Sequence, residues 1–111
     1  MGRMVGKRMG KSMDIEEKYV GEKLILKVKG RLDSVTAPQM EEVVSRILES
    51  TEELVVDFAE LEYISSAGLR VLLNVHKKME MKEGRMAVTG AGQEVREVFV
   101  ITGFSEILHM E

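Results

Sequence analysis

The chain has 111 residues, of which 44% are hydrophobic and 32% charged, and this fits one globular domain with a single core. It contains no cysteine, which excludes disulfide frameworks, thiolate nucleophiles and zinc–thiolate sites. No apolar run approaches the ~18 residues that a membrane-spanning helix needs, so we expect no membrane span.

Charge divides the chain into two parts. Residues 1–12 carry four basic residues and no acid, and subtracting +4 from the net charge of −3 leaves −7 for residues 13–111. An acidic body argues against direct binding to nucleic acid. We expect residues 1–12 to be a disordered basic tail or an over-extended start, with translation beginning near Met13. Residues 13–111 are then the folded domain.

Two strands are expected next. Residues 15–20 and residues 23–29 are rich in β-forming side chains, and apolar and lysine residues alternate in the second segment. Gly21 and Glu22 lie between them, in an order that suits a two-residue hairpin turn. Gly30 ends the second strand. The pattern predicts an N-terminal antiparallel hairpin.

A loop over residues 31–35 precedes the first expected helix. Thr36 and the following Ala-Pro-Gln resemble a capping box with proline in the first turn. Apolar residues then recur at helical spacing, at Met40, Val43, Val44, Ile47 and Leu48. The apolar run at residues 54–58 is short and nearly continuous, and we expect a central parallel strand that is covered on both faces.

The second half of the chain continues the alternation of strands and helices. A helix is expected over residues 67–82, a strand over residues 85–89, and a third helix that contains Val95 and ends at Gly103. Residues 107–108 supply a last short strand or turn. The order predicts an α/β fold with a small mixed, mainly parallel sheet, an N-terminal antiparallel hairpin strand and about four helices.

Two hydroxyl groups, on Ser65 and Ser66, lie between an apolar strand region and the second helix. A helix N-terminus has free backbone N–H groups and the positive end of the helix dipole, so an anionic group is tolerated there. The small neighbours Ala67 and Gly68 leave the hydroxyls accessible to another macromolecule. We interpret this junction as a site for docking or phosphorylation.

Enzymatic alternatives lack the residues they need, and we expect no catalytic residue, metal or cofactor. A serine nucleophile requires a positioned base, yet His76 and His109 are the two histidines of the chain and both are interpreted as structural. The glycines at residues 90–92 are not followed by the Lys-Ser/Thr of a P-loop. Asp57 ends a strand as a receiver-domain aspartate would, but no paired acids accompany it to hold magnesium.

The motif at residues 63–70, Tyr-Ile-Ser-Ser-Ala-Gly-Leu-Arg, resembles the signature of STAS domains, the family of bacterial anti-sigma-factor antagonists. Residues 30–37, Gly-Arg-Leu-Asp-Ser-Val-Thr-Ala, resemble the family's loop between a strand and the first helix. The resemblance extends over about residues 14–110. It implies a STAS-like fold and a cytoplasmic protein that works by partner switching.

In such a switch, the unmodified antagonist binds an anti-sigma factor with a serine-kinase fold, which phosphorylates one serine and thereby ends the complex until a serine phosphatase restores it. The resemblance places the acceptor at Ser66. Ser65 stands where many antagonists have aspartate, which leaves Ser65 as the alternative acceptor. It also keeps open a non-phosphorylated STAS interaction module, in a signalling complex or as a soluble subunit of a transport system.

The resemblance further implies a partner-binding surface around the acceptor. The residues that we expect to form it are Asp33, Thr36, Ser65, Gly68, Leu69 and Arg70. Asp33 and Thr36 have a second interpretation, in which they only organise the loop and cap the first helix.

Overall fold

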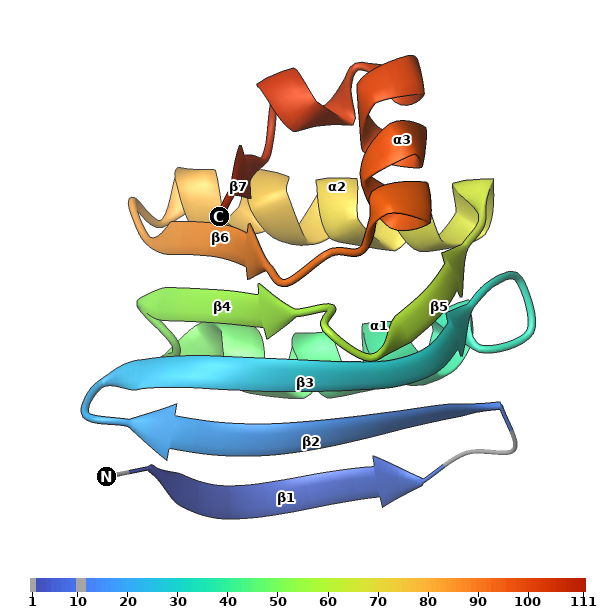
Figure 1. The fold of residues 1–111 in the computed structure, drawn as a ribbon. Helices are drawn as coiled ribbons and strands as arrows, with labels where there is room; N and C mark the ends of the chain where they lie inside the picture. Colours follow the sequence, from blue (N-terminus) through green and yellow to red (C-terminus); the bar gives the residue numbers. More distant parts are fainter. Residues whose placement is uncertain (1, 10–11) are drawn as a thin grey trace.

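The computed structural model describes residues 2–9 and 12–111, with the first strand described by its backbone alone (Figure 1). The strands are β1 (Arg3–Met9), β2 (Met13–Val20), β3 (Lys23–Leu32), β4 (Glu53–Asp57), β5 (Leu61–Ile64), β6 (Arg85–Thr89) and β7 (His109–Met110). The helices are α1 (Ala37–Ile47), α2 (Ser66–Met81) and α3 (Gln93–Thr102), with two short 3-10 turns, η1 (Leu48–Ser50) and η2 (Phe104–Glu106).

One mixed sheet of seven strands runs through the described part of the chain, in the order β1-β2-β3-β4-β6-β7, with β5 paired to β3. The pairs β1/β2 and β2/β3 are antiparallel, and the pairs among β3, β4, β5, β6 and β7 are parallel. The α/β class and the N-terminal hairpin are as predicted. The described residues contain three α-helices rather than about four, because the segment after α3 forms one 3-10 turn, η2, that is too short to continue as helix.

Residues 3–9 belong to the segment for which a disordered basic tail or an over-extended start is expected. Its backbone forms β1, with Arg3 opposite Tyr19 and Met9 opposite Asp14 on β2. An edge strand is held by backbone hydrogen bonds to its neighbour, and a basic composition does not prevent this pairing. Residues 1, 10 and 11 lie outside the described residues. A start of translation near Met13 stays a prediction.

Helices α1 and α2 cover one face of the sheet (Figure 1). Their apolar faces pack on alternate residues of the strands, and these strand residues are fully buried: Leu24, Leu26, Leu54, Val56 and Val88. At the end of β4, Phe58 stacks on Phe99 of α3, with 6.4 Å between the ring centroids. The core therefore lies between the sheet and its helices.

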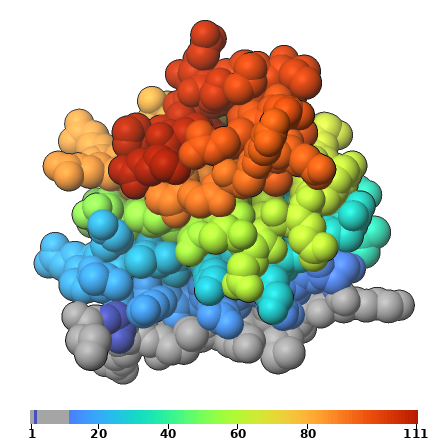
Figure 2. Space-filling view, in the orientation of Figure 1, coloured from blue at the N-terminus to red at the C-terminus, as the bar shows by residue number. Residues whose placement is uncertain are grey.

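No helix of the described residues covers the opposite face of β4, so the expectation of a strand covered on both faces was wrong. Figure 2 shows β3, β4 and β6 contributing to the visible surface on this side. Lys23, Glu53 and Arg85 are neighbours in register across the three strands, and Lys23 Nζ lies 3.8 Å from Glu53 Oε2. Alternating charge keeps this face hydrated while the backbone ladder stays intact.

Candidate functional site

Ser65 is the N-cap of α2. Its backbone is extended, with φ −102° and ψ 176°, and its hydroxyl oxygen accepts a hydrogen bond from the backbone N–H of Gly68 at 3.5 Å. This hydroxyl therefore satisfies one of the free N–H groups of the first turn. Ser66, the first helical residue, is exposed, and no hydrogen bond of its hydroxyl is found among the described residues. The structure thus gives the two serines different environments.

Gly68 lets the first turn of α2 lie directly against the end of β3. A Cβ at this position would be 2.8 Å from the Leu32 carbonyl oxygen, 2.8 Å from Leu32 Cγ and 2.9 Å from Ile64 Cγ1. The backbone N–H of Ser65 also donates to the Leu32 carbonyl at 2.9 Å. Because Asp33 directly follows Leu32, the contact fixes the start of α2 beside the loop between β3 and α1.

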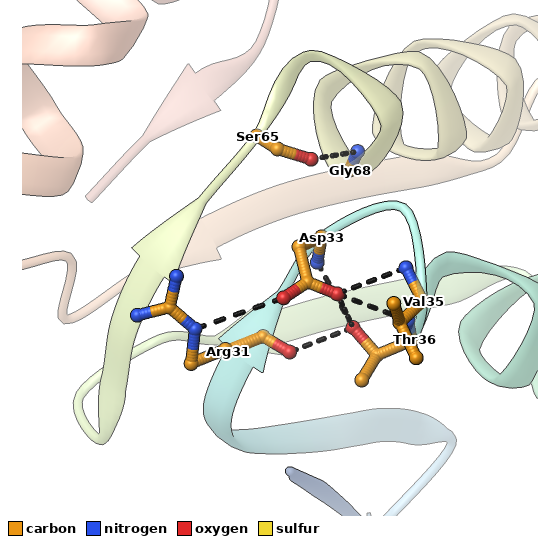
Figure 3. Close-up of polar contacts among 6 residues, drawn as sticks. All are labelled: Arg31, Asp33, Val35, Thr36, Ser65 and Gly68. Carbon is orange, nitrogen blue, oxygen red and sulfur yellow. Dashed lines mark hydrogen bonds and ion pairs between the residues drawn. The ribbon is translucent and has the colours of Figure 1, made fainter.

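Asp33 and Thr36 hold this loop together (Figure 3). The Asp33 carboxylate accepts hydrogen bonds from the backbone N–H groups of Val35, at 3.0 Å, and Thr36, at 3.1 Å. The Thr36 hydroxyl accepts from the N–H of Asp33 at 2.9 Å and donates to the carbonyl of Arg31 at 2.7 Å. Both side chains are thus used to shape the loop.

The expected capping box at Thr36 is not formed. Thr36 is at the N-cap position of α1, but its backbone is helical and its side chain makes no cap hydrogen bond to the helix. The competing partners are the backbone groups of Arg31 and Asp33, which the loop brings within reach of the hydroxyl. These bonds to the loop backbone satisfy the Thr36 hydroxyl in place of a bond to the first turn of α1.

The loop stabilises the ionised form of the Asp33 carboxyl group. The hydrogen bond from the Thr36 backbone lowers the pKa of Asp33, and the N–H of Val35, the Thr36 hydroxyl and the Arg31 charge lower it further, while partial burial opposes them. Arg31 Nε lies 3.6 Å from Asp33 Oδ2, and the guanidinium stands 4.3 Å from the centre of the Tyr63 ring. Arg31 thus bridges the loop and β5.

An exposed surface surrounds the serines. Val35, at the tip of the loop, is 80% exposed, Tyr63 is 43% exposed, and both Ser66 and Arg70 face solvent. The sequence analysis missed Val35, Tyr63 and Arg31 as members of this surface. Arg31 and Tyr63 meet only because β3 and β5 pair in register, and a four-residue strand has no strong periodic signal.

Three of the expected partner-binding residues are buried. Leu69 is 6% exposed and packs in the core, Thr36 is 4% exposed, and Gly68 is buried against β3. These residues determine the position of the surface rather than lie on it. Asp33 is intermediate, with 22% of its side chain exposed.

The arrangement around the serines offers no nearby histidine as a base. His76 is ten residues after Ser66 on α2, roughly 15 Å along the helix axis. Its Nε2 is 3.5 Å from Glu80, and His109 on β7 is 3.2 Å from Glu111. Asp57 accepts a hydrogen bond from the backbone of Ala59 at 2.9 Å, as part of the turn after β4.

In residues 2–9 and 12–111, no cluster of three or more histidine, aspartate or glutamate side chains has a geometry that could hold a metal ion. None of the helices in this part of the chain is both long enough and apolar enough to cross a bilayer.

The STAS domain family matches residues 14–111. BtrV of Bordetella bronchiseptica, described as a candidate anti-sigma factor antagonist, is 39% identical over 85 residues, which cover 76% of this chain and 73% of BtrV. The crystal structure of an anti-sigma factor antagonist from Mycobacterium paratuberculosis superposes with a TM-score of 0.83 at 26% identity, over 89% of this chain and 85% of that one.

The fold is also similar to that of a third known protein. The Bacillus cell fate determinant SpoIIAA, solved in a phosphorylated form, has a TM-score of 0.70 and 19% identity, and the match covers 87% of this chain and 90% of that chain.

Proposed function

Since the chain belongs to the STAS domain family, we propose that it is an anti-sigma-factor antagonist that acts by partner switching. In the unmodified state it binds an anti-sigma factor with a serine-kinase fold through the surface formed by Val35, Tyr63, Ser66 and Arg70. Phosphorylation of Ser66 by that partner ends the complex, and a serine phosphatase restores it. The protein and its partners then act in the cytoplasm.

The observation that carries this proposal is the different use of the two hydroxyl groups. The Ser65 hydroxyl caps α2 through Gly68, whereas Ser66 is exposed and its hydroxyl has no partner among the described residues. The Ser65 hydroxyl is engaged at the start of α2, whereas the Ser66 hydroxyl is open to an approaching kinase, and modification of Ser66 leaves the cap in place. This supports Ser66 as the acceptor. The phosphorylated form of SpoIIAA supports a phosphate-dependent switch on the same fold.

The physical effect of phosphate is large for a partner and small for the domain. It adds roughly −1.5 to −2 charge near neutral pH. At the first residue of α2, the helix dipole favours that charge, so the fold is retained. An acidic group of the partner about 4 Å away would be repelled by roughly 1–4 kcal/mol per charge pair. Since about 1.4 kcal/mol is a tenfold change in affinity, one phosphate removes a large part of a moderate interface.

The experiment uses the purified protein, its anti-sigma partner and ATP, with intact mass as the readout. The unmodified chain gains about 80 Da, the mass of one phosphoryl group. Ser66→Ala abolishes the gain and keeps binding, and Ser65→Ala, the matched control, is still labelled. Labelling of Ser66→Ala would move the acceptor to Ser65.

A second candidate function is the non-phosphorylated STAS interaction module. The observation that favours it is Ser65 itself, in the position where many antagonists have aspartate. In that case the partner binds the same surface but no mass is gained with any cognate kinase, and Asp33→Ala still weakens binding. An unchanged affinity of Asp33→Ala would restrict Asp33 to shaping the loop.

A further inference from the structure

We propose that Arg70 is the internal counter-ion of phosphorylated Ser66, so that modification also neutralises a cation of the partner-binding surface. This inference rests on the proposed phosphorylation of Ser66. It adds a named residue that senses the phosphate within the chain. Phosphorylation of Ser66 then reverses the charge of the surface around Arg70.

Ser66 and Arg70 lie close to each other on α2. Ser66 and Arg70 are the first and fifth residues of α2, so they are separated by four positions. Residues at this spacing are neighbours on the same helix face. Helical side chains also lean toward the N-terminus, which directs the Arg70 side chain back over the turn that carries Ser66. Both residues are exposed, so neither must leave the core to meet the other.

Arg70 is not engaged by another residue of the described part of the chain. Arg31, on β3, is already engaged by the Asp33 carboxylate and the Tyr63 ring. Arg70 makes no ion pair or hydrogen bond with any residue of the described part of the chain. Residue 74, one turn further along the helix, is the neutral Asn74, so no acid on α2 competes at this spacing. Arg70 is therefore free to take a new anion.

The guanidinium group of Arg70 is suited to binding a phosphate. A phosphate has three acceptor oxygens, and the planar guanidinium can donate two parallel hydrogen bonds to it. Before modification, positions 66 and 70 together carry a charge of +1. Afterwards they carry about −1, because phosphoserine adds close to −2. A partner group that is attracted by Arg70 in the unmodified protein therefore meets a surface of the opposite sign.

The test does not require a kinase. Phosphoserine is incorporated at position 66 during translation, and the second ionisation of its phosphate is followed by ³¹P NMR at low salt. Arg70 favours the doubly charged phosphate, so Arg70→Gln lowers the acid dissociation constant about two- to fivefold. Arg70→Lys restores part of the effect, and high salt reduces the difference.

Two control variants locate the effect. Lys77→Gln removes another exposed cation of α2, roughly 16 Å along the axis from Ser66, and leaves the titration unchanged. Arg31→Gln also leaves it unchanged. An unchanged titration in Arg70→Gln, or a change in Arg31→Gln of equal size, overturns the inference. Failure of the proposed function is seen separately, as the absence of kinase-dependent labelling, and does not alter this titration.

Discussion

Replacing Gly68 with alanine would place a methyl group between α2 and β3. The added Cβ would be 2.8 Å from both the carbonyl oxygen and Cγ of Leu32, and 2.9 Å from Ile64 Cγ1. The side-chain carbons could yield by a change of rotamer, but the carbonyl oxygen belongs to a strand that is paired on both sides. The helix must therefore move away from β3.

The magnitude follows from two opposing effects. Inserting a methyl into a close-packed contact costs typically 1–3 kcal/mol. Alanine is better than glycine in a helix by about 1 kcal/mol, which offsets part of this cost. Because one of the close atoms is backbone, we expect the upper part of the range and a net loss of about 1–2 kcal/mol. For a domain of this size, the melting temperature falls by roughly 5–10 °C.

The assay is denaturant and thermal unfolding followed by circular dichroism, with Gly92→Ala as the matched control. Gly92 also has a negative φ, of −71°, and a Cβ there would meet no atom within 4 Å. We expect Gly92→Ala to remain close to the unmodified protein. If Gly68→Ala is as stable as Gly92→Ala, the close approach of α2 to β3 does not constrain this position and the reasoning is refuted.

Three other predictions concern the loop and the core. Hydrogen bonds and charge lower the pKa of Asp33 in the folded state, so its stabilisation is present above the unfolded pKa and is lost as the pH falls through the folded pKa. Unfolding across a pH series should therefore show Asp33→Asn less stable at neutral pH and equal to the unmodified protein in acid; a constant difference would contradict this. Thr36→Val removes the hydroxyl that bonds two backbone groups and should cost about 1–3 kcal/mol in denaturant unfolding, whereas Thr36→Ser keeps it. Equal stability of the two variants would show that the hydroxyl is dispensable. Phe99→Ala should cost about 3–5 kcal/mol because the ring is fully buried, while Ile101→Ala, at a position 84% exposed, should stay within about 0.5 kcal/mol; similar losses would argue against the packing of α3 described above.

Helical periodicity predicted the main helices because it is a local property. The apolar spacing from Met40 to Leu48 located α1, and Gly103 adopts the left-handed conformation, φ 80°, expected of a residue that ends a helix. On α2, Val71 and Val75 are buried, and the side chain of His76 is 17% exposed and paired with Glu80.

The sequence by itself determined the class of fold, the strand-to-helix junction and the presence of two serines there, because these depend on neighbours along the chain. Tertiary structure decided which of the two hydroxyl groups caps α2 and which stays exposed. Ser65 is bound by Gly68 as a cap, and Ser66 is left exposed. It also decided that Arg31 contacts Tyr63, since the pairing of β3 with the short β5 brings together residues that are far apart in sequence. Contacts of this kind have no local pattern, and only the folded chain defines them.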